Sequence, residues 1–359
     1  MQPISEFVKP DPLPKYFAID VDGTFFTTNK EIFERNTKAF KLLKNNGITP
    51  FLCTARDPAS NSQIIDSSFV KETDYQGYPG VYANGSLVYD CNGNLIKNEL
   101  LSSHFLEKFN DYAQSKKITD KTIYLTDNGL FCLDQLSNKG RDYINRKTMC
   151  DPITTNFEDL KQKNVVSIIT VEHPLDDFEL INEVCYVKYN KGNVFQLSPR
   201  GCSKKMGIEA LLKHFNSNGN ECAYIGDNAN DREAMQYCRL SFAVGNADDL
   251  TKRNAKWVLD LKYDEGGFEK AVYSLVLHKQ NCQFTLECQG TGHELSEDTH
   301  WTNFSPRTII VNGSVFNFER VSWNEGSSFL EIDLRTDTDL SAKQESSATR
   351  ELTEPKFKI

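Results

Sequence analysis

The order of apolar and polar residues predicts buried strands that alternate with amphipathic helices. Short apolar runs at Tyr16–Asp20, Ile48–Thr54 and Val81–Asn84 end abruptly in polar residues. Continuous runs of this length are typical of strands that are buried on both faces of a parallel sheet. Residues 31–46 place apolar side chains along one face, with Gly47 just past the end, which predicts a helix between the first two strands.

The same pattern returns later in the chain. Ser203 is a candidate N-cap for a helix with one apolar face. Strand-like runs follow at Cys222–Asp227, Ser241–Val244 and Lys256–Leu259. We therefore predict one doubly wound α/β core, interrupted by an inserted domain.

Residues 87–197 have a different pattern of apolar and polar residues, in which strand-like runs are mixed with helix-like segments at 102–116 and 174–183. This mixture predicts an inserted α+β cap domain, and it leaves residues 15–86 and 198–276 as the core. The strand-like runs of the insert are Thr122–Thr126, Val165–Val171, Val184–Tyr189 and Asn193–Leu197.

The two ends of the chain differ from the core. Residues 1–14 hold four prolines and are expected to form a flexible arm. Residues 277–336 contain further strand-like runs, with Asn312-Gly as a candidate hairpin turn, so this region is expected to be β-rich. Residues 337–359 are polar, and we expect a disordered tail.

Composition narrows the class of protein. The 359 residues carry a formal net charge of -9, which argues against nucleic acid or an anionic membrane as the main partner. The chain has no run of about 18 apolar residues, and its N-terminus lacks the apolar region of a signal peptide. The ten cysteines form no C-x-x-C pair, which argues against zinc. We expect a cytoplasmic protein.

Carboxylates gather where two predicted strands end. Phe17–Thr24 reads FAIDVDGT and Tyr224–Asp231 reads YIGDNAND. Ligands of open α/β sheets bind at the carboxyl ends of the strands, so Asp20, Asp22 and Asp227, with Asp231, are expected to share one crevice. Crowded carboxylates repel each other unless a cation joins them, and an all-oxygen site with octahedral geometry favours Mg²⁺.

These residue types also suit phosphoryl chemistry. Of Asp20 and Asp22, which stand two residues apart, one carboxylate could attack phosphorus while the other handles a proton on the leaving oxygen. A simple Asp-Gly turn after a strand is the alternative. A calcium-binding EF-hand loop fits poorly, because Thr24 stands where the next carboxylate is expected.

Four further residues have both a chemical and a structural interpretation. Asn230 could hydrogen-bond a phosphate oxygen and Asp231 could orient a neighbour, although either could simply cap a helix. The hydroxyl of Thr54 could donate to phosphate, although threonine also favours strands. Lys204 begins a helix against the macrodipole, so it either neutralises a bound phosphate or reaches solvent.

Taken together, the segments resemble the haloacid dehalogenase (HAD) superfamily over roughly residues 15–276. The order is D-x-D-G-T, a strand ending in Thr, a Lys at a helix start, and G-D-x-x-N-D. The long insert and Asn84-Gly85 after the third strand resemble the Cof-like sugar-phosphatase branch of that superfamily. Two departures are Ala55, where the branch usually has Gly, and Phe25-Phe26, where aliphatic residues are usual.

The resemblance implies specific roles. Asp20 would be the nucleophile and Asp22 the general acid/base, while Thr54 and Lys204 would hold the phosphoryl group. Asp20, Asp227 and the main-chain carbonyl of Asp22 would bind Mg²⁺. Asn230 would contact phosphate. The supporting residues would be Asp231, Arg56 and Asn84.

The expected function is therefore Mg²⁺-dependent hydrolysis of small phosphorylated metabolites through an aspartyl phosphate. A phosphomutase or phosphotransferase using the same site is one alternative. A non-catalytic regulatory protein that binds such metabolites is another, although every reactive side chain of the pattern survives. The C-terminal region is a candidate for binding an unknown partner. His293 and His300 lie near acidic residues there, but a solvated loop explains them better than a metal site.

Overall fold

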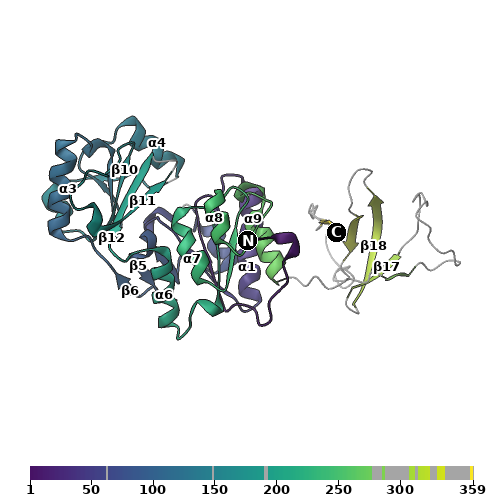
Figure 1. Cartoon of the computed structure of the whole chain (residues 1–359). Coiled ribbons are helices and arrows are strands. Elements are labelled where there is room, and N and C mark those ends of the chain that lie inside the picture. Colours follow the sequence, from purple (N-terminus) through teal and green to yellow (C-terminus); the bar gives the residue numbers. More distant parts are fainter. Residues whose placement is uncertain are drawn as a thin grey trace. The chain divides into compact units, whose positions relative to one another are not determined.

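A computed structural model describes most of the chain (Figure 1). The chain divides into two units, Met1–His278 and Lys279–Ile359. The first unit contains a nine-stranded and a six-stranded sheet, and the second contains a five-stranded sheet. The described residues are 1–61, 64–147, 149–189 and 193–276, together with five strands of the second unit.

The nine-stranded sheet has the order β1-β15-β14-β13-β2-β3-β4-β5-β6. All pairs from β1 to β4 are parallel, and β5 and β6 continue the sheet antiparallel. Its strands are β1 (Gln2–Pro3), β2 (Tyr16–Ile19), β3 (Thr49–Cys53), β4 (Gly80–Tyr82), β5 (Leu87–Tyr89), β6 (Leu95–Asn98), β13 (Cys222–Gly226), β14 (Leu240–Ala243) and β15 (Trp257–Val258). On one side of β2 the next strands are β3 and β4, and on its other side they are β13, β14 and β15. The switch point between β2 and β13 is where such a fold places its ligand.

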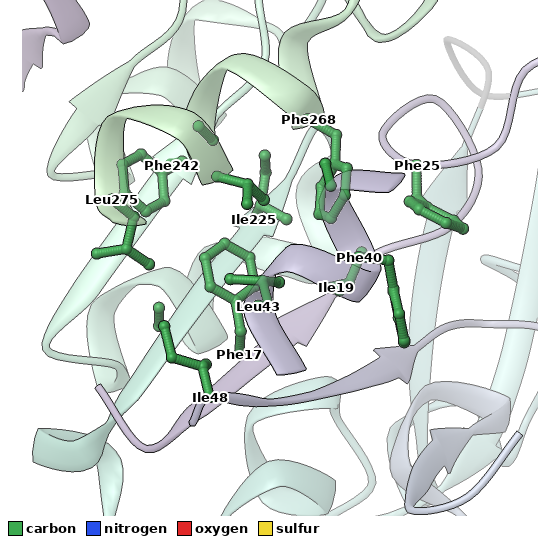
Figure 2. Close-up of a cluster of buried hydrophobic side chains, with 14 of the residues drawn as sticks. Phe17, Ile19, Phe25, Phe40, Leu43, Ile48, Ile225, Phe242, Phe268 and Leu275 are labelled. Carbon is green, nitrogen blue, oxygen red and sulfur yellow. The ribbon is translucent and has the colours of Figure 1, made fainter. Parts of the chain in front are cut away.

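Helices cover both faces of this sheet, as the buried apolar strands predict. On one face, Phe17 and Ile19 of β2 meet Phe40 of α1 and Phe268 of α9, and all four side chains are fully buried (Figure 2). The helices of this face are α1 (Lys30–Asn45), α2 (Ser67–Thr73) and α9 (Gly267–Val276). The other face packs against α6 (Lys204–His214) and α7 (Arg232–Tyr237), and α8 (Asp249–Asn254) contacts α7. The predicted doubly wound α/β core is confirmed.

The six-stranded sheet has the order β11-β12-β10-β7-β8-β9 and consists only of residues from the insert and its end. Its strands are β7 (Thr122–Thr126), β8 (Gly129–Cys132), β9 (Ile153–Thr154), β10 (Val165–Val171), β11 (Val184–Tyr189) and β12 (Val194–Pro199). One face packs against α3 (Ser103–Ser115) and α5 (Phe157–Lys161). The other packs against α4 (Asn138–Arg146) and shares a buried cluster with Tyr82 and Leu87 of the core.

Three details differ from the sequence-based expectations. The helix expected at 174–183 is wrong: successive turns there end in a short 3-10 helix, Ile181–Glu183. Leu175, Phe178 and Ile181 recur every three residues. The amides of Phe178 and Ile181 donate to the carbonyls three residues earlier, so the spacing reflects turns rather than an α-helix. Residues 87–98, expected in the insert, form β5 and β6 of the core sheet.

The N-terminal segment is the third difference. Instead of a flexible arm, Gln2–Pro3 form the edge strand β1, which pairs with β15. Ile4 and Phe7 are buried in the core, and Phe7 contacts the rings of Phe242 and Trp257. Prolines mark this segment as irregular, but the two apolar side chains anchor it.

The second unit forms an antiparallel sheet in the order β16-β17-β18-β19-β20. Its strands are β16 (Thr285–Glu287), β17 (Arg307–Val311), β18 (Ser314–Trp323), β19 (Leu330–Arg335) and β20 (Lys356–Lys358). Val311 pairs with Ser314, as a hairpin requires, while Asn312 and Gly313 lie outside the described residues. So do His293, His300 and most of the predicted disordered tail, of which β20 is the described part. None of the helices in the described ranges has the length and apolar character of a membrane span.

Candidate active site

Three carboxylates meet at the switch point of the core sheet. Asp20 follows β2 and Asp227 follows β13, and the amide of Asp20 donates to the carbonyl of Ile225 on the neighbouring strand at 3.0 Å. Asp231 lies in the short helical turn after Asp227. One oxygen from each of these three carboxylates lies within 4.8 Å of the others. The structure thus brings together the strand ends that the sequence pointed to.

Lys204 enters this cluster from the first turn of α6. Its Nζ donates to Asp20 Oδ1 and, at 2.7 Å, to Asp231 Oδ1, and its side chain is 1% exposed. Burial alone would lower the pKa of Lys204, but the two carboxylates raise it well above its usual value. The side chain is therefore a buried ammonium aimed at the carboxylates rather than an exposed lysine that reaches solvent.

Asp231 organises the loop that carries Asp227. Its Oδ2 accepts the main-chain amides of Asp227 and Asn228, each at 2.8 Å. Its Oδ1 accepts from the Tyr224 hydroxyl at 2.6 Å as well as from Lys204. Asn228, the residue at the N-cap, completes a capping box with Asp231. Asp231 therefore takes part in the cap of this turn and also fixes the loop that carries Asp227.

Two oxygens of the cluster have the environment of metal ligands. Asp20 Oδ2 and Asp227 Oδ1 are buried, and within the described part of the chain they accept no hydrogen bond. An unsatisfied buried carboxylate oxygen is costly. Burial raises the pKa of Asp20 to about 6 although Lys204 lowers it, and burial with the charge of Asp20 raises the pKa of Asp227 well above its usual value. A divalent cation with oxygen ligands, such as Mg²⁺, fits this donor set.

Gly23 permits the close approach of the first motif to Asp227. Its φ of +83° lies in the left-handed region, and a Cβ at this position would stand 2.5 Å from Asp227 Oδ2. Asn246 completes this corner by donating to the Gly23 carbonyl at 2.9 Å and to Asp227 Oδ2 at 3.2 Å. Asn246 was missed in the sequence, although it follows the end of β14 and the same strand-end rule would have found it.

Asp22 points to a different set of partners. Arg56 Nε donates to Asp22 Oδ2 at 2.8 Å and Arg56 Nη2 donates to Oδ1 at 2.7 Å, in a bidentate pair. Lys147 of the insert brings its Nζ within 3.3 Å of Asp22 Oδ1. Burial alone would raise the pKa of Asp22, but Lys147 and Arg56 hold it well below its usual range. In this arrangement Asp22 is an ionised carboxylate.

Arg56 also connects the core to the insert. Its Nη1 donates to the Ser60 carbonyl at 3.0 Å, and its Nη2 donates to the main-chain carbonyl of Lys147 at 2.6 Å. Thr54 lies below it, 1% exposed, with its hydroxyl accepting the amide of Arg56 at 3.1 Å. The guanidinium of Arg56 is thus held by four acceptor atoms on three residues, one of them in the insert.

Asn84 makes a second connection between the two sheets. It follows β4 with a left-handed backbone, φ 53°. Its Nδ2 donates to the Tyr189 hydroxyl at 3.0 Å and to Gln196 Oε1 at 2.9 Å, both in the insert. Its Oδ1 accepts from Asn230 Nδ2 at 2.9 Å. Asn84 and Asn230 therefore form a polar chain from the site into the insert.

Comparison with known proteins decides the family. Residues 17–272 match the family model described as haloacid dehalogenase-like hydrolase. The chain belongs to this family.

Individual relatives agree with the match. The chain is 26% identical over 292 residues to phosphatase YwpJ from Bacillus subtilis, covering 70% of this chain and 96% of YwpJ. It is 24% identical over 279 residues to a chloroplastic endoribonuclease YBEY of Arabidopsis thaliana, of which the match spans 46%. A HAD/COF-like hydrolase from Plasmodium vivax superposes with a TM-score of 0.66 at 26% identity, over 74% of this chain and 96% of that one.

The cavity of this HAD-like hydrolase lies between the core and the insert. It has a volume of about 590 Å³, counting its open mouth, and the core side includes Asp20, Asp22, Asp227 and Asn230. From the insert come Tyr143, Lys147, Met149, Ile169, Tyr189, Val194 and Gln196. Sequence reasoning missed all of these residues, because they lie on separate elements and share no local motif.

Proposed function

We propose that this HAD-like hydrolase is a Mg²⁺-dependent phosphatase of small phosphorylated metabolites, acting through an aspartyl phosphate on Asp20. The observation that carries the proposal is the buried cluster at the switch point. In it, Asp20 has one oxygen held by Lys204 and the other left without a hydrogen bond beside Asp227. That arrangement supplies a fixed nucleophile, an ammonium and a cation site within one hydrogen-bonded unit.

The first step would transfer the phosphoryl group to the protein. A carboxylate oxygen of Asp20 attacks phosphorus in line while the bond to the ester oxygen breaks. Lys204 stays hydrogen-bonded to Asp20 and offsets the negative charge that gathers there, and Thr54 and Asn230 are assigned to the phosphoryl oxygens. Mg²⁺, held by Asp20, Asp227 and the main-chain carbonyl of Asp22, would supply further charge neutralisation when bound.

Asp22 would manage the proton. In the first step it donates a proton to the leaving oxygen, and in the second it takes one from the water that attacks the aspartyl phosphate. The products are an alcohol and inorganic phosphate, and Asp20 is regenerated. Because Asp22 is paired with Arg56 and Lys147, it must turn away from at least one of them to act as an acid.

The insert would serve as a cap that closes the site. Its residues form one side of the cavity, and both Arg56 and Asn84 bind it from the core. A closed cap excludes water from the first transfer and brings specificity contacts to the leaving group. The cap expected at residues 87–197 would be shorter at its start: we propose that its first hinge lies after β6 rather than before β5, because β5 and β6 pair within the core sheet.

The names of relatives support the class of substrate. Phosphatase YwpJ is one, and another is the 5-amino-6-(5-phospho-D-ribitylamino)uracil phosphatase YcsE of Bacillus subtilis, which is 22% identical over 264 residues. The first name states phosphatase activity alone, and the second names a phosphorylated small molecule.

The test is a screen of phosphate monoesters with and without Mg²⁺, followed by a single-turnover experiment. After an acid quench, mass spectrometry should find a phosphoryl group on the peptide that contains Asp20, and it should be absent from Asp20→Asn. Release of inorganic phosphate by Asp20→Asn at a rate near that of the unmodified protein would overturn the mechanism. Transfer to an added sugar instead of water would replace the phosphatase by a phosphotransferase.

A further inference from the structure

Tyr143 of the insert carries a hydroxyl group that is not engaged within the described protein. It lies on α4 and lines the cavity together with Asp22 and Arg56 of the core. Its side chain is 9% exposed, and its hydroxyl has no hydrogen bond to any residue that the structure describes. Buried polar groups are as a rule hydrogen-bonded. The hydroxyl of Tyr143 therefore has its donor and its acceptor positions available to water or to a bound molecule.

Other buried tyrosines show what a structural hydroxyl does in this protein. The hydroxyl of Tyr75 donates to a main-chain carbonyl at 2.8 Å, and that of Tyr224 donates to Asp231 Oδ1 at 2.6 Å. Tyr124 also has no partner among the described residues, but it lies in an apolar cluster of the insert. Tyr143 differs from all of these because its side chain faces a cavity lined by charged and polar groups.

The charged groups around Tyr143 place it on the leaving-group side of the cavity. Burial raises the pKa of Tyr143 above its usual value, while Lys147 opposes this effect and Asp22 adds to it. The phenol is therefore neutral near pH 7 and can both donate and accept a hydrogen bond. Tyr143 precedes Lys147 by four residues, so both side chains leave α4 on the same face. The Nζ of Lys147 is 3.3 Å from Oδ1 of Asp22, the residue assigned to the leaving oxygen.

The neighbouring polar groups of the insert already have partners. Gln196 Oε1 accepts from Asn84 at 2.9 Å, and Gln196 Nε2 donates to Ser167 Oγ at 2.8 Å. The Tyr189 hydroxyl accepts from Asn84 at 3.0 Å. The apolar lining residues of the insert are Met149, Ile169 and Val194. Among these described groups, the hydroxyl of Tyr143 keeps its full hydrogen-bonding capacity, and a neutral hydroxyl on a bound ester matches it as both donor and acceptor.

We propose that Tyr143 is a specificity-determining residue, whose hydroxyl binds a hydroxyl group of the leaving alcohol and so favours hydroxylated phosphate monoesters over plain alkyl ones. The proposal rests on the proposed phosphatase function and names the contact that selects the leaving group at the same site. A site built to hydrogen-bond a substrate hydroxyl rejects an analogue that lacks it, because the polar group of the protein is then left unpaired.

The rival explanation is that Tyr143 only packs within the insert. Its ring belongs to the buried cluster that also contains Tyr82 and Leu87 of the core. If packing were its whole role, removal of the hydroxyl would change the turnover of all substrates alike or of none.

A pair of matched esters separates the two explanations. Glycerol 3-phosphate and n-propyl phosphate share the phosphoryl group and a three-carbon chain, and they differ in the hydroxyl groups of that chain. Tyr143→Phe keeps the ring and removes only the hydroxyl. The unmodified protein should prefer glycerol 3-phosphate in kcat/KM, and Tyr143→Phe should reduce this preference by roughly 3- to 10-fold, the worth of one hydrogen bond between uncharged groups. The kcat/KM for n-propyl phosphate should stay nearly constant.

Thermal unfolding gives a second readout. Since the hydroxyl has no partner among the described residues, Tyr143→Phe should keep the melting temperature of the unmodified protein. A lower melting temperature would show that the hydroxyl is bound within the protein, against the proposal.

The control is Tyr112→Phe. Tyr112 lies on α3 of the insert, and its hydroxyl donates to the exposed carboxylate of Asp177. The preference for glycerol 3-phosphate should be unchanged in this variant. Equal changes on both esters in Tyr143→Phe, or a preference that this variant leaves unaltered, would overturn the proposal and favour the rival explanation.

Failure of the proposed function would give a different result. If the unmodified protein hydrolyses neither ester in the presence of Mg²⁺, and no other ester of a wider screen, the phosphatase function is wrong. Titration calorimetry with the same two esters decides the inference wherever neither of them is turned over. Tighter binding of glycerol 3-phosphate that is lost in Tyr143→Phe supports the contact, whereas equal affinities or no binding of either ester rule it out.

Discussion

The core and the insert contribute to the same cavity in different ways. The core supplies carboxylates from strand ends and Lys204 from one helix start, and hydrogen bonds hold them in a buried network around Asp231. The insert supplies polar and apolar side chains from α4 and several strands, with one ammonium. The core side of the cavity therefore comes from short sequence motifs, whereas the insert side depends on how distant elements meet. The two halves should respond differently to substitution.

The largest expected effect is on the core nucleophile. Asp20→Asn should lower kcat by at least ~10⁴-fold, because the amide is a poor nucleophile and a weaker metal ligand. The fold should survive, since the amide keeps the shape of the side chain. Steady-state turnover and thermal unfolding measure the two effects. Asp260→Asn, at an exposed pair with Lys270, is the matched control and should leave turnover unchanged. Turnover within tenfold of the unmodified protein would break the assignment.

Removal of the metal should have the second largest effect on turnover. Excess EDTA should reduce turnover by about 10²-fold or more and added Mg²⁺ should restore it, because Asp20 and Asp227 would otherwise repel each other near the incoming phosphate. Ca²⁺ should inhibit, since it prefers more ligands and looser geometry. The same titration followed by thermal unfolding should show stabilisation by Mg²⁺. Full turnover in EDTA would contradict the cation site.

Truncation of apolar side chains should sharpen the contrast between the regions. Phe40 of the core and Phe109 of the insert are both fully buried, and replacing either by Ala should cost about 3–5 kcal/mol of unfolding free energy. At a temperature where both variants stay folded, Phe109→Ala should shift KM more than kcat, because the reactive groups lie in the core. Denaturant unfolding and steady-state kinetics test this together. A fall in kcat alone for Phe109→Ala would contradict the expectation that the insert acts mainly on KM.

The smallest effect is expected from the C-terminal unit. A chain that ends after Val276, the last residue of α9, should keep its turnover on the best substrate within about twofold, since the described site residues all lie before that point. The measurement is phosphate release by the purified fragment, with circular dichroism as the control for folding. If a folded fragment that still binds Mg²⁺ lost its turnover, the C-terminal unit would belong to the site.

The sequence predicts the core well because its signals are local. The carboxylates of Asp20 and Asp227 follow apolar runs, and Lys204 breaks the charge preference of a helix start, so each can be noticed without a fold. Strands of the insert such as Val165–Val171 were also predicted with the right bounds. The helix predicted at 174–183 was wrong, because apolar residues spaced three apart occur in successive turns as well as in helices.

Lys147 shows why the rest could not be predicted. Nothing in its neighbourhood along the chain differs from an ordinary basic helix end. Its importance comes from Asp22 and Arg56, which lie about a hundred residues earlier and approach it only when the insert packs on the core. The pairing of Asp22 with Arg56 was likewise hidden, since no periodicity relates a turn after β2 to the loop after β3.

The hydrogen bond from Arg56 to residue 147 has an evolutionary consequence. Arg56 binds the main-chain carbonyl of that residue, and every amino acid offers the same acceptor. A substitution at position 147 can therefore change the side chain that lines the cavity, while the hydrogen bond from Arg56 to the main chain of the insert remains. A fold joined in this way can change the lining of its cavity one side chain at a time, without first losing the contact between the core and the insert.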